Sequence, residues 1–152
     1  MQFFTVDWWC GIQDGEVSDP AEAYRVHFQN ICEQLPPDLA ALSESVSLHD
    51  SRLRTFKLDT GAQSLQMSLD GDDGRGHLRH FSLTYRDVKS LQSFADPDAG
   101  LNGPHGYGDW GYDEAHVLPD GDFEHRILFS TGIEIRIAFS DFSLAYIDES
   151  DC

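Results

Sequence analysis

The chain has 152 residues and a mass of 17.1 kDa, enough for one hydrophobic core and too little for two comfortable domains. Its 27 acidic and 10 basic residues give a formal net charge of -17, which repels nucleic acid and anionic membranes and attracts basic proteins. We therefore expect a single domain over residues 1–152 that binds neither nucleic acid nor membrane, with a basic protein as its partner. The alternative is that the charge serves solubility alone.

The composition also indicates a folded protein of the cytoplasm. Hydrophobic residues make up 40% of the chain and aromatic residues 12%, values typical of a globular domain. No apolar run approaches the length of a membrane span, and the start lacks the pattern of a signal peptide. Cys10, Cys32 and Cys152 are odd in number and widely spaced, which predicts free thiols.

A helix is predicted over residues 19–35. Asp19 is expected at its N-cap, Pro20 at the first helical position and Glu22 at the third. Apolar residues then recur at helical spacing and form one stripe: Tyr24, Phe28, Ile31, Cys32 and Leu35. Two prolines at positions 36 and 37 end the helix.

Antiparallel strands account for most of the remaining chain. Three are predicted over residues 52–58, 63–69 and 78–85 from alternating apolar and polar residues. A four-stranded meander follows within residues 112–148, in segments 114–118, 123–129, 133–139 and 142–147. The linkers 119–121 and 130–132 suit three-residue loops with a left-handed glycine.

Pairing across the 130–132 loop sets the register of this meander. It places Phe129 opposite Ile133, Ile127 opposite Ile135 and His125 opposite Ile137, because a slip by one residue would put the isoleucines in water. One face is then apolar: Ala115, Val117, Phe123, Ile127, Phe129, Ile133, Ile135, Ile137, Phe139, Phe142, Leu144 and Tyr146. The other face is expected in water, with ordinary cross-strand pairs: Glu114, His116, Glu124, Arg126, Glu134 and Arg136.

These elements predict an α+β fold. We expect an antiparallel β-meander sheet of about seven strands with the N-terminal helix packed on its apolar face. The predicted core consists of Phe3, Tyr24, Phe28, Ile31, Leu65, Met67, Phe81, Leu83, Ile127, Ile135, Ile137 and Leu144.

The stretch 95–112 is a long loop in which glycines alternate with ring-bearing residues. Loops of this length in a compact domain are usually functional or mobile, and aromatic side chains on a loop make good anchors. We expect a binding surface here, with His105, Tyr107, Trp110 and Tyr112 as its residues. The alternative is a lid packed on the edge of the sheet.

His49 and Asp50, between the helical region and the strands, are candidate catalytic residues. An adjacent His and Asp can act as an acid/base or ligand pair, and His125 on the apolar face would be the third member. The simpler interpretation is that Asp50 orders the turn and His49 bonds to the backbone. His125 would then be a core histidine satisfied by Asp50 or Tyr24.

Known enzyme and metal patterns are missing from the sequence. It contains no nucleophile elbow, phosphate loop, dinucleotide fingerprint or zinc-protease motif. Asp70 opens a calcium-like loop, but Gly74 and Phe81 stand where oxygen ligands are needed. We expect no metal and no cofactor.

Several fragments resemble a bacterial family of unknown function, family 4085 of the domain-of-unknown-function series. They are residues 3–5, 48–51, 112–114 and 123–129. The step from Leu48 to Ser51 is also similar to small immunity-type proteins of bacterial toxin systems. The resemblance implies a bacterial, cytosolic protein and brings no known activity or catalytic residue.

The sequence thus favours a non-enzymatic, acidic protein-binding domain, in the manner of an immunity protein. One alternative is a small hydrolytic or metal-dependent enzyme using His49, Asp50 and His125. Another is a small-ligand binder that uses the loop 95–112.

Overall fold

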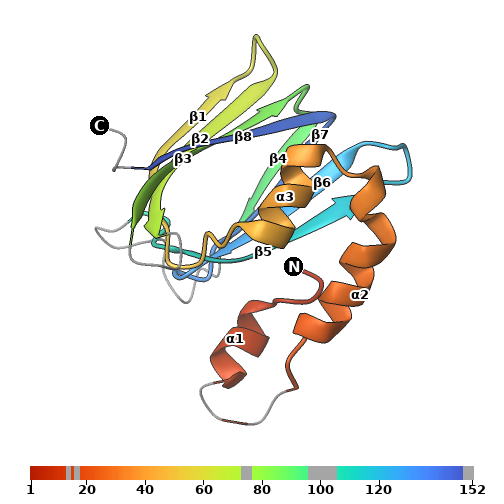
Figure 1. Ribbon diagram of the computed structural model, residues 1–152, viewed down its shortest axis with the longest axis vertical. Helices are drawn as coiled ribbons and strands as arrows, with labels where there is room; N and C mark the ends of the chain where they lie inside the picture. Colours follow the sequence, from red (N-terminus) through yellow and green to blue (C-terminus); the bar gives the residue numbers. More distant parts are fainter. Residues whose placement is uncertain (13–14, 16–17, 73–76, 96–105, 149–152) are drawn as a thin grey trace.

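The computed structural model describes residues 1–12, 15, 18–72, 77–95 and 106–148 (Figure 1). Within them are three α-helices, a short 3-10 turn (η1, Cys32–Gln34) and eight strands. The helices are α1 (Val6–Ile12), α2 (Ala21–Ile31) and α3 (Pro37–Ser45). The strands are β1 (Arg52–Asp59), β2 (Ser64–Asp72), β3 (Leu78–Arg86), β4 (Ser90–Phe94), β5 (Trp110–Val117), β6 (Phe123–Phe129), β7 (Glu134–Phe139) and β8 (Asp141–Asp148). Among the described helices, none has the length and apolarity needed to cross a membrane.

The α+β class is confirmed, but the strands form two sheets instead of one sheet of about seven. One sheet has the order β1-β2-β3-β8 and the other β4-β7-β6-β5, and all pairs are antiparallel. β6 and β7 pair in the predicted register, with Ile127 opposite Ile135 and His125 opposite Ile137. Gly132 at the turn between them has φ +82°, the left-handed conformation predicted for it.

The strand that was predicted as the fourth of the meander belongs to the other sheet. β8 starts two residues after β7 ends, yet it pairs with β3 over its whole length, and β4 takes the place beside β7. The crossing lies at Ser140, whose hydroxyl is 2.6 Å from a carboxylate oxygen of Asp87. Asp87 has φ +53° and marks the opposite crossing, from β3 to β4. The two crossings therefore lie side by side and allow both sheets to close over one core.

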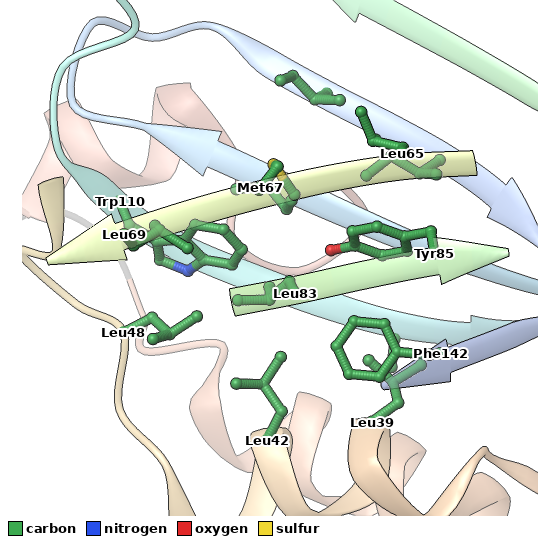
Figure 2. Close-up of a cluster of buried hydrophobic side chains, with 14 of the residues drawn as sticks. Leu39, Leu42, Leu48, Leu65, Met67, Leu69, Leu83, Tyr85, Trp110 and Phe142 are labelled. Carbon is green, nitrogen blue, oxygen red and sulfur yellow. The ribbon is translucent and has the colours of Figure 1, made fainter. Parts of the chain in front are cut away.

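The helices cover one open side of this pair of sheets (Figure 1). The first helical residue of α2 is Ala21 and not Pro20, so Pro20 takes the N-cap position that was predicted for Asp19, and Asp19 accepts a 2.9 Å hydrogen bond from the Ala21 N–H. α2 contacts a sheet, as predicted, but along the edge strand β5 and not on an apolar face. α3 supplies the buried Leu39 and Leu42; in Figure 2 Leu39 lies beside Phe142, and Leu42 points toward Leu83.

Most of the predicted core is buried between the sheets. Phe28 and residues from both sheets belong to it: Leu65, Met67, Phe81, Leu83, Ile127, Ile135 and Ile137. Tyr24, Ile31 and Leu144 are half-buried against it, and Phe3 is half-buried with its ring 5.5 Å from that of Tyr24. Trp110 is 1% exposed and fills the end of the core near Leu48 and Leu69 (Figure 2).

Candidate functional site

A pocket of about 610 Å³ opens between the segment that follows α3 and the first residues of β5. Its apolar wall is formed by Leu42 and Leu48 and by three aromatic rings, those of Phe4, Tyr24 and Tyr112. Its polar lining includes Glu44, His49 and Asp113 together with Ser43. The volume lies within the range of small-molecule sites, so this pocket is the natural candidate for a functional site.

Asp113, in the lining of this pocket, is held by two nitrogen donors from the core. Trp110 Nε1 donates to Oδ1 over 3.1 Å, and His125 Nε2 donates to Oδ2 over 2.9 Å. On the far side of the ring, His125 Nδ1 lies 2.8 Å from the hydroxyl of Tyr85. A neutral ring protonated at Nε2 satisfies the chain, because Tyr85 then donates to Nδ1 and both nitrogens have a partner.

His125 is therefore a satisfied core histidine with partners other than those expected. Its side chain is 0% exposed, and its partners are Tyr85 and Asp113 in place of Asp50 or Tyr24. Asp113 was not predicted as a site residue, although the predicted strand register could have indicated its position. It precedes Ala115 by two residues, so it shares the inward face of β5 and lies diagonally across from His125.

His49 lines the pocket and Asp50 does not, and neither is among the hydrogen-bond or ring partners of His125. His49 Nδ1 donates to the carbonyl oxygen of Gly111 over 2.6 Å, which leaves the lone pair of a neutral ring on Nε2. Nε2 is 3.6 Å from Asp50 Oδ1, and both side chains are exposed. The structure thus brings His49 and Asp113 to one pocket, while the three predicted catalytic residues are not joined.

The predicted binding residues of the long loop are divided between core and pocket. Trp110 is buried, Tyr107 is half-buried against Phe56 and Phe129, and His105 lies outside the described residues. Tyr112 lines the pocket, and its ring stacks on Phe4 at 5.2 Å with an interplanar angle of 14°.

The prediction that Glu114 and His116 lie in water was wrong. Glu114 is 0% exposed because residues 2–4 cross over it and donate three backbone N–H groups to its carboxylate. His116 Nε2 lies 3.0 Å from the same carboxylate. Burial would raise the pKa of Glu114, but the hydrogen bonds from His116 and from the backbone of Gln2, Phe4 and Phe3 lower it to about 2.

Tyr24 in the pocket wall and Tyr85 in the core keep their protons. Burial and the charge of Asp113 raise the pKa of Tyr24 and of Tyr85 well above the usual value for a phenol. The Tyr24 hydroxyl accepts the Ala115 N–H over 2.9 Å and remains neutral. The described residues contain no group of three or more His, Cys, Asp or Glu side chains that could hold a metal ion.

A family model described as "Protein of unknown function (DUF4085)" matches residues 5–138. The chain belongs to this family. The match spans most of the chain, including the three α-helices, strands β1 to β6 and all but the last residue of β7. The DUF4085 description assigns no activity, and it lends no support to a similarity with toxin-immunity proteins. No curated protein matches the chain.

Proposed function

We propose that this member of the DUF4085 family is a non-enzymatic cytoplasmic protein that binds a basic protein through its helical side. The observation that carries the proposal is the higher density of negative charge in the first 50 residues of the chain. Residues 1–50 contain nine acidic residues and a single basic residue, Arg25. Arg25 is paired with Glu22 through a 2.8 Å hydrogen bond, so the other eight acidic residues of this segment have no lysine or arginine within it to offset them.

The acidic side chains of this segment are placed to meet a partner. Asp7, Asp19, Glu33 and Glu44 are all exposed. In the sheets, by contrast, basic side chains form ion pairs with neighbouring carboxylates, in the pairs Arg54–Asp70, Arg86–Asp141, Lys89–Asp87, Arg126–Glu124 and Arg136–Glu134. Residues 1–50 therefore carry a net charge of -8 over 50 residues, against -9 over the 102 residues that follow, and this higher density of negative charge would steer a basic protein toward the helical side.

Use of His125 in acid/base catalysis gains no support from the geometry. Its ring is fully buried, and both nitrogens are occupied by Tyr85 and Asp113. A general base must come within hydrogen-bond distance of the substrate, and this ring reaches no surface. The polar network is instead suited to holding Asp113 in one orientation.

The test combines capture of a partner with two matched sets of substitutions. The first set, Asp7→Asn, Asp19→Asn and Glu33→Gln, removes three negative charges from the helical side. The control set, Asp109→Asn, Asp120→Asn and Asp141→Asn, removes three from exposed positions near the strands. A protein captured from the native cell would be purified, and its affinity for the wild type and for both variants would be measured at rising salt.

We expect a one-to-one complex with a basic protein that weakens with salt, and a loss of about tenfold for the helical set only. Equal losses for both sets would mean general charge attraction and would overturn the proposal. Failure to reconstitute any complex from purified components would do the same.

A further inference from the structure

We propose that the pocket between α3 and β5 is a binding site for a guanidinium group. This inference deepens the proposed function. It rests on that function only if the guanidinium group belongs to a side chain of the basic partner. The same chemistry would also accept a free small molecule that carries a guanidinium.

The first reason is the charge of the lining. Glu44 and Asp113 contribute two carboxylates, and the described lining contains no lysine or arginine. Arg25 lines a neighbouring hollow that shares Glu44, but it is paired with Glu22. An anion would therefore meet only repulsion here, and a cation would be attracted.

The second reason is that the carboxylates of the pocket only accept hydrogen bonds, and its serine hydroxyls can accept them as well as donate. The carboxylates of Asp113 and Glu44 offer only oxygen acceptors. The Ser43 hydroxyl oxygen is buried beside Tyr24 and makes no well-formed hydrogen bond. A guanidinium has five N–H donors and no acceptor, so it matches this set better than a ligand that must also receive hydrogen bonds.

The third reason is the aromatic wall, which favours an organic cation over a metal ion. Tyr112 is fixed by stacking on Phe4 and by edge contacts with Trp8 at 5.0 Å and Trp9 at 5.2 Å. A planar guanidinium can lie over such a ring and gain a cation–π interaction. Asp113 is 21% exposed and held by two donors, so one carboxylate is already oriented before a ligand arrives.

The experiment titrates the purified protein with L-arginine amide and, separately, with L-citrulline amide, which has nearly the same shape but an uncharged side chain. Binding is followed by calorimetry and by amide chemical shifts in NMR spectra. Glu44→Gln removes one charge from the pocket. Glu33→Gln removes one charge from an exposed position outside it and serves as the matched control.

We expect saturable one-to-one binding of arginine amide with shifts at Gly111, Tyr112 and Asp113, and much weaker binding of citrulline amide. Glu44→Gln should weaken binding of arginine amide about threefold, the effect of one partly exposed charge pair, while Glu33→Gln leaves it unchanged. Equal binding of the two amides, or equal effects of the two substitutions, would overturn the proposal of a guanidinium site.

The outcome separates this inference from the proposed function. If a basic partner binds but arginine amide does not, the helical surface functions without the pocket and the guanidinium site is wrong. If arginine amide binds and displaces the partner, while citrulline amide does not, the guanidinium belongs to a side chain of the partner. If arginine amide binds and no partner exists, the ligand is a free small molecule and only the proposed function fails.

Discussion

The hydroxyl of Tyr85 and Nδ1 of His125 lie 2.8 Å apart in the core, one on β3 and the other on β6. The bond therefore links the two sheets through a polar contact from which water is excluded. It also sets the ring orientation in which His125 donates to Asp113 at the pocket. A core built in this way couples the packing of the sheets to the geometry of the pocket.

Tyr85→Phe should lower the free energy of unfolding by about 1–3 kcal/mol, because it leaves a buried nitrogen of His125 without its partner. Urea unfolding followed by tryptophan fluorescence measures the loss. Tyr146→Phe is the matched control, since Tyr146 is half exposed on β8. Equal midpoints for the two variants would show that the Tyr85 hydroxyl contributes nothing to stability.

Glu114→Gln should destabilise the protein in a pH-dependent manner. The pKa of Glu114 is lowered from 4.5 to about 2 in the folded state, so its charge stabilises the fold above pH 4.5, and this contribution is lost as the pH falls toward 2. The difference amounts to about 3 kcal/mol at pH 7, by the relation of 1.36 kcal/mol for each pKa unit.

Urea unfolding of both proteins between pH 7 and pH 2 checks this. The gap between wild type and Glu114→Gln should be constant near neutral pH and should shrink below pH 4.5. Glu33→Gln, at an exposed position, should show no such gap. A gap that persists unchanged at pH 2 would contradict the assigned role of the charge.

The register of β6 and β7 could be predicted because it depends on residues close in sequence. The alternating isoleucines and the glycine loop leave one pairing that buries Ile127, Ile135 and Ile137 together. The same local pattern could not show that β8 joins β3. That choice depends on which distant strand offers a free edge, and Asp141 pairs with Arg86 55 residues earlier in the chain.

The burial of Glu114 could not be predicted from the sequence for a similar reason. Period-two alternation assigns a residue to a face, and it does not say whether another segment covers that face. Here the cover is residues 2–4, more than a hundred positions away in sequence. The pocket depends on the same long-range arrangement, since Phe4 and Tyr112 stack there. His125 was placed correctly on the inner face, but its partners required the three-dimensional structure.

Gly111→Ala should destabilise the protein by about 1–3 kcal/mol through overpacking. A Cβ at Gly111 would lie 2.5 Å from the Trp9 ring and 2.8 Å from the carbonyl oxygen of Leu128, so α1 or β5 must move. Gly61→Ala is the control, because its Cβ would meet only an oxygen of Asp59 at 3.4 Å. Urea midpoints and the emission of Trp9 report the effect. Similar midpoints for the two variants would mean that Trp9 does not pack on Gly111.

Tyr24→Phe should open the edge of the sheet at β5. In the folded protein the Tyr24 hydroxyl accepts the Ala115 N–H over 2.9 Å, and His27 Nε2 donates to the Ala115 carbonyl over 3.1 Å. These bonds satisfy an edge strand that would otherwise present free backbone groups to another chain. The substitution keeps the ring beside Phe3 and Phe4 and removes the hydroxyl group alone.

Hydrogen exchange at the Ala115 amide is the measurement, because it reports this one bond. We expect exchange at Ala115 to accelerate in Tyr24→Phe, with a loss of about 1–3 kcal/mol in stability for the unpaired N–H. The amide of Ile127, on β6 inside the sheet, should exchange more rapidly only to the extent that global stability falls. If Ala115 and Ile127 change together, α2 stabilises the fold as a whole and does not protect the edge specifically.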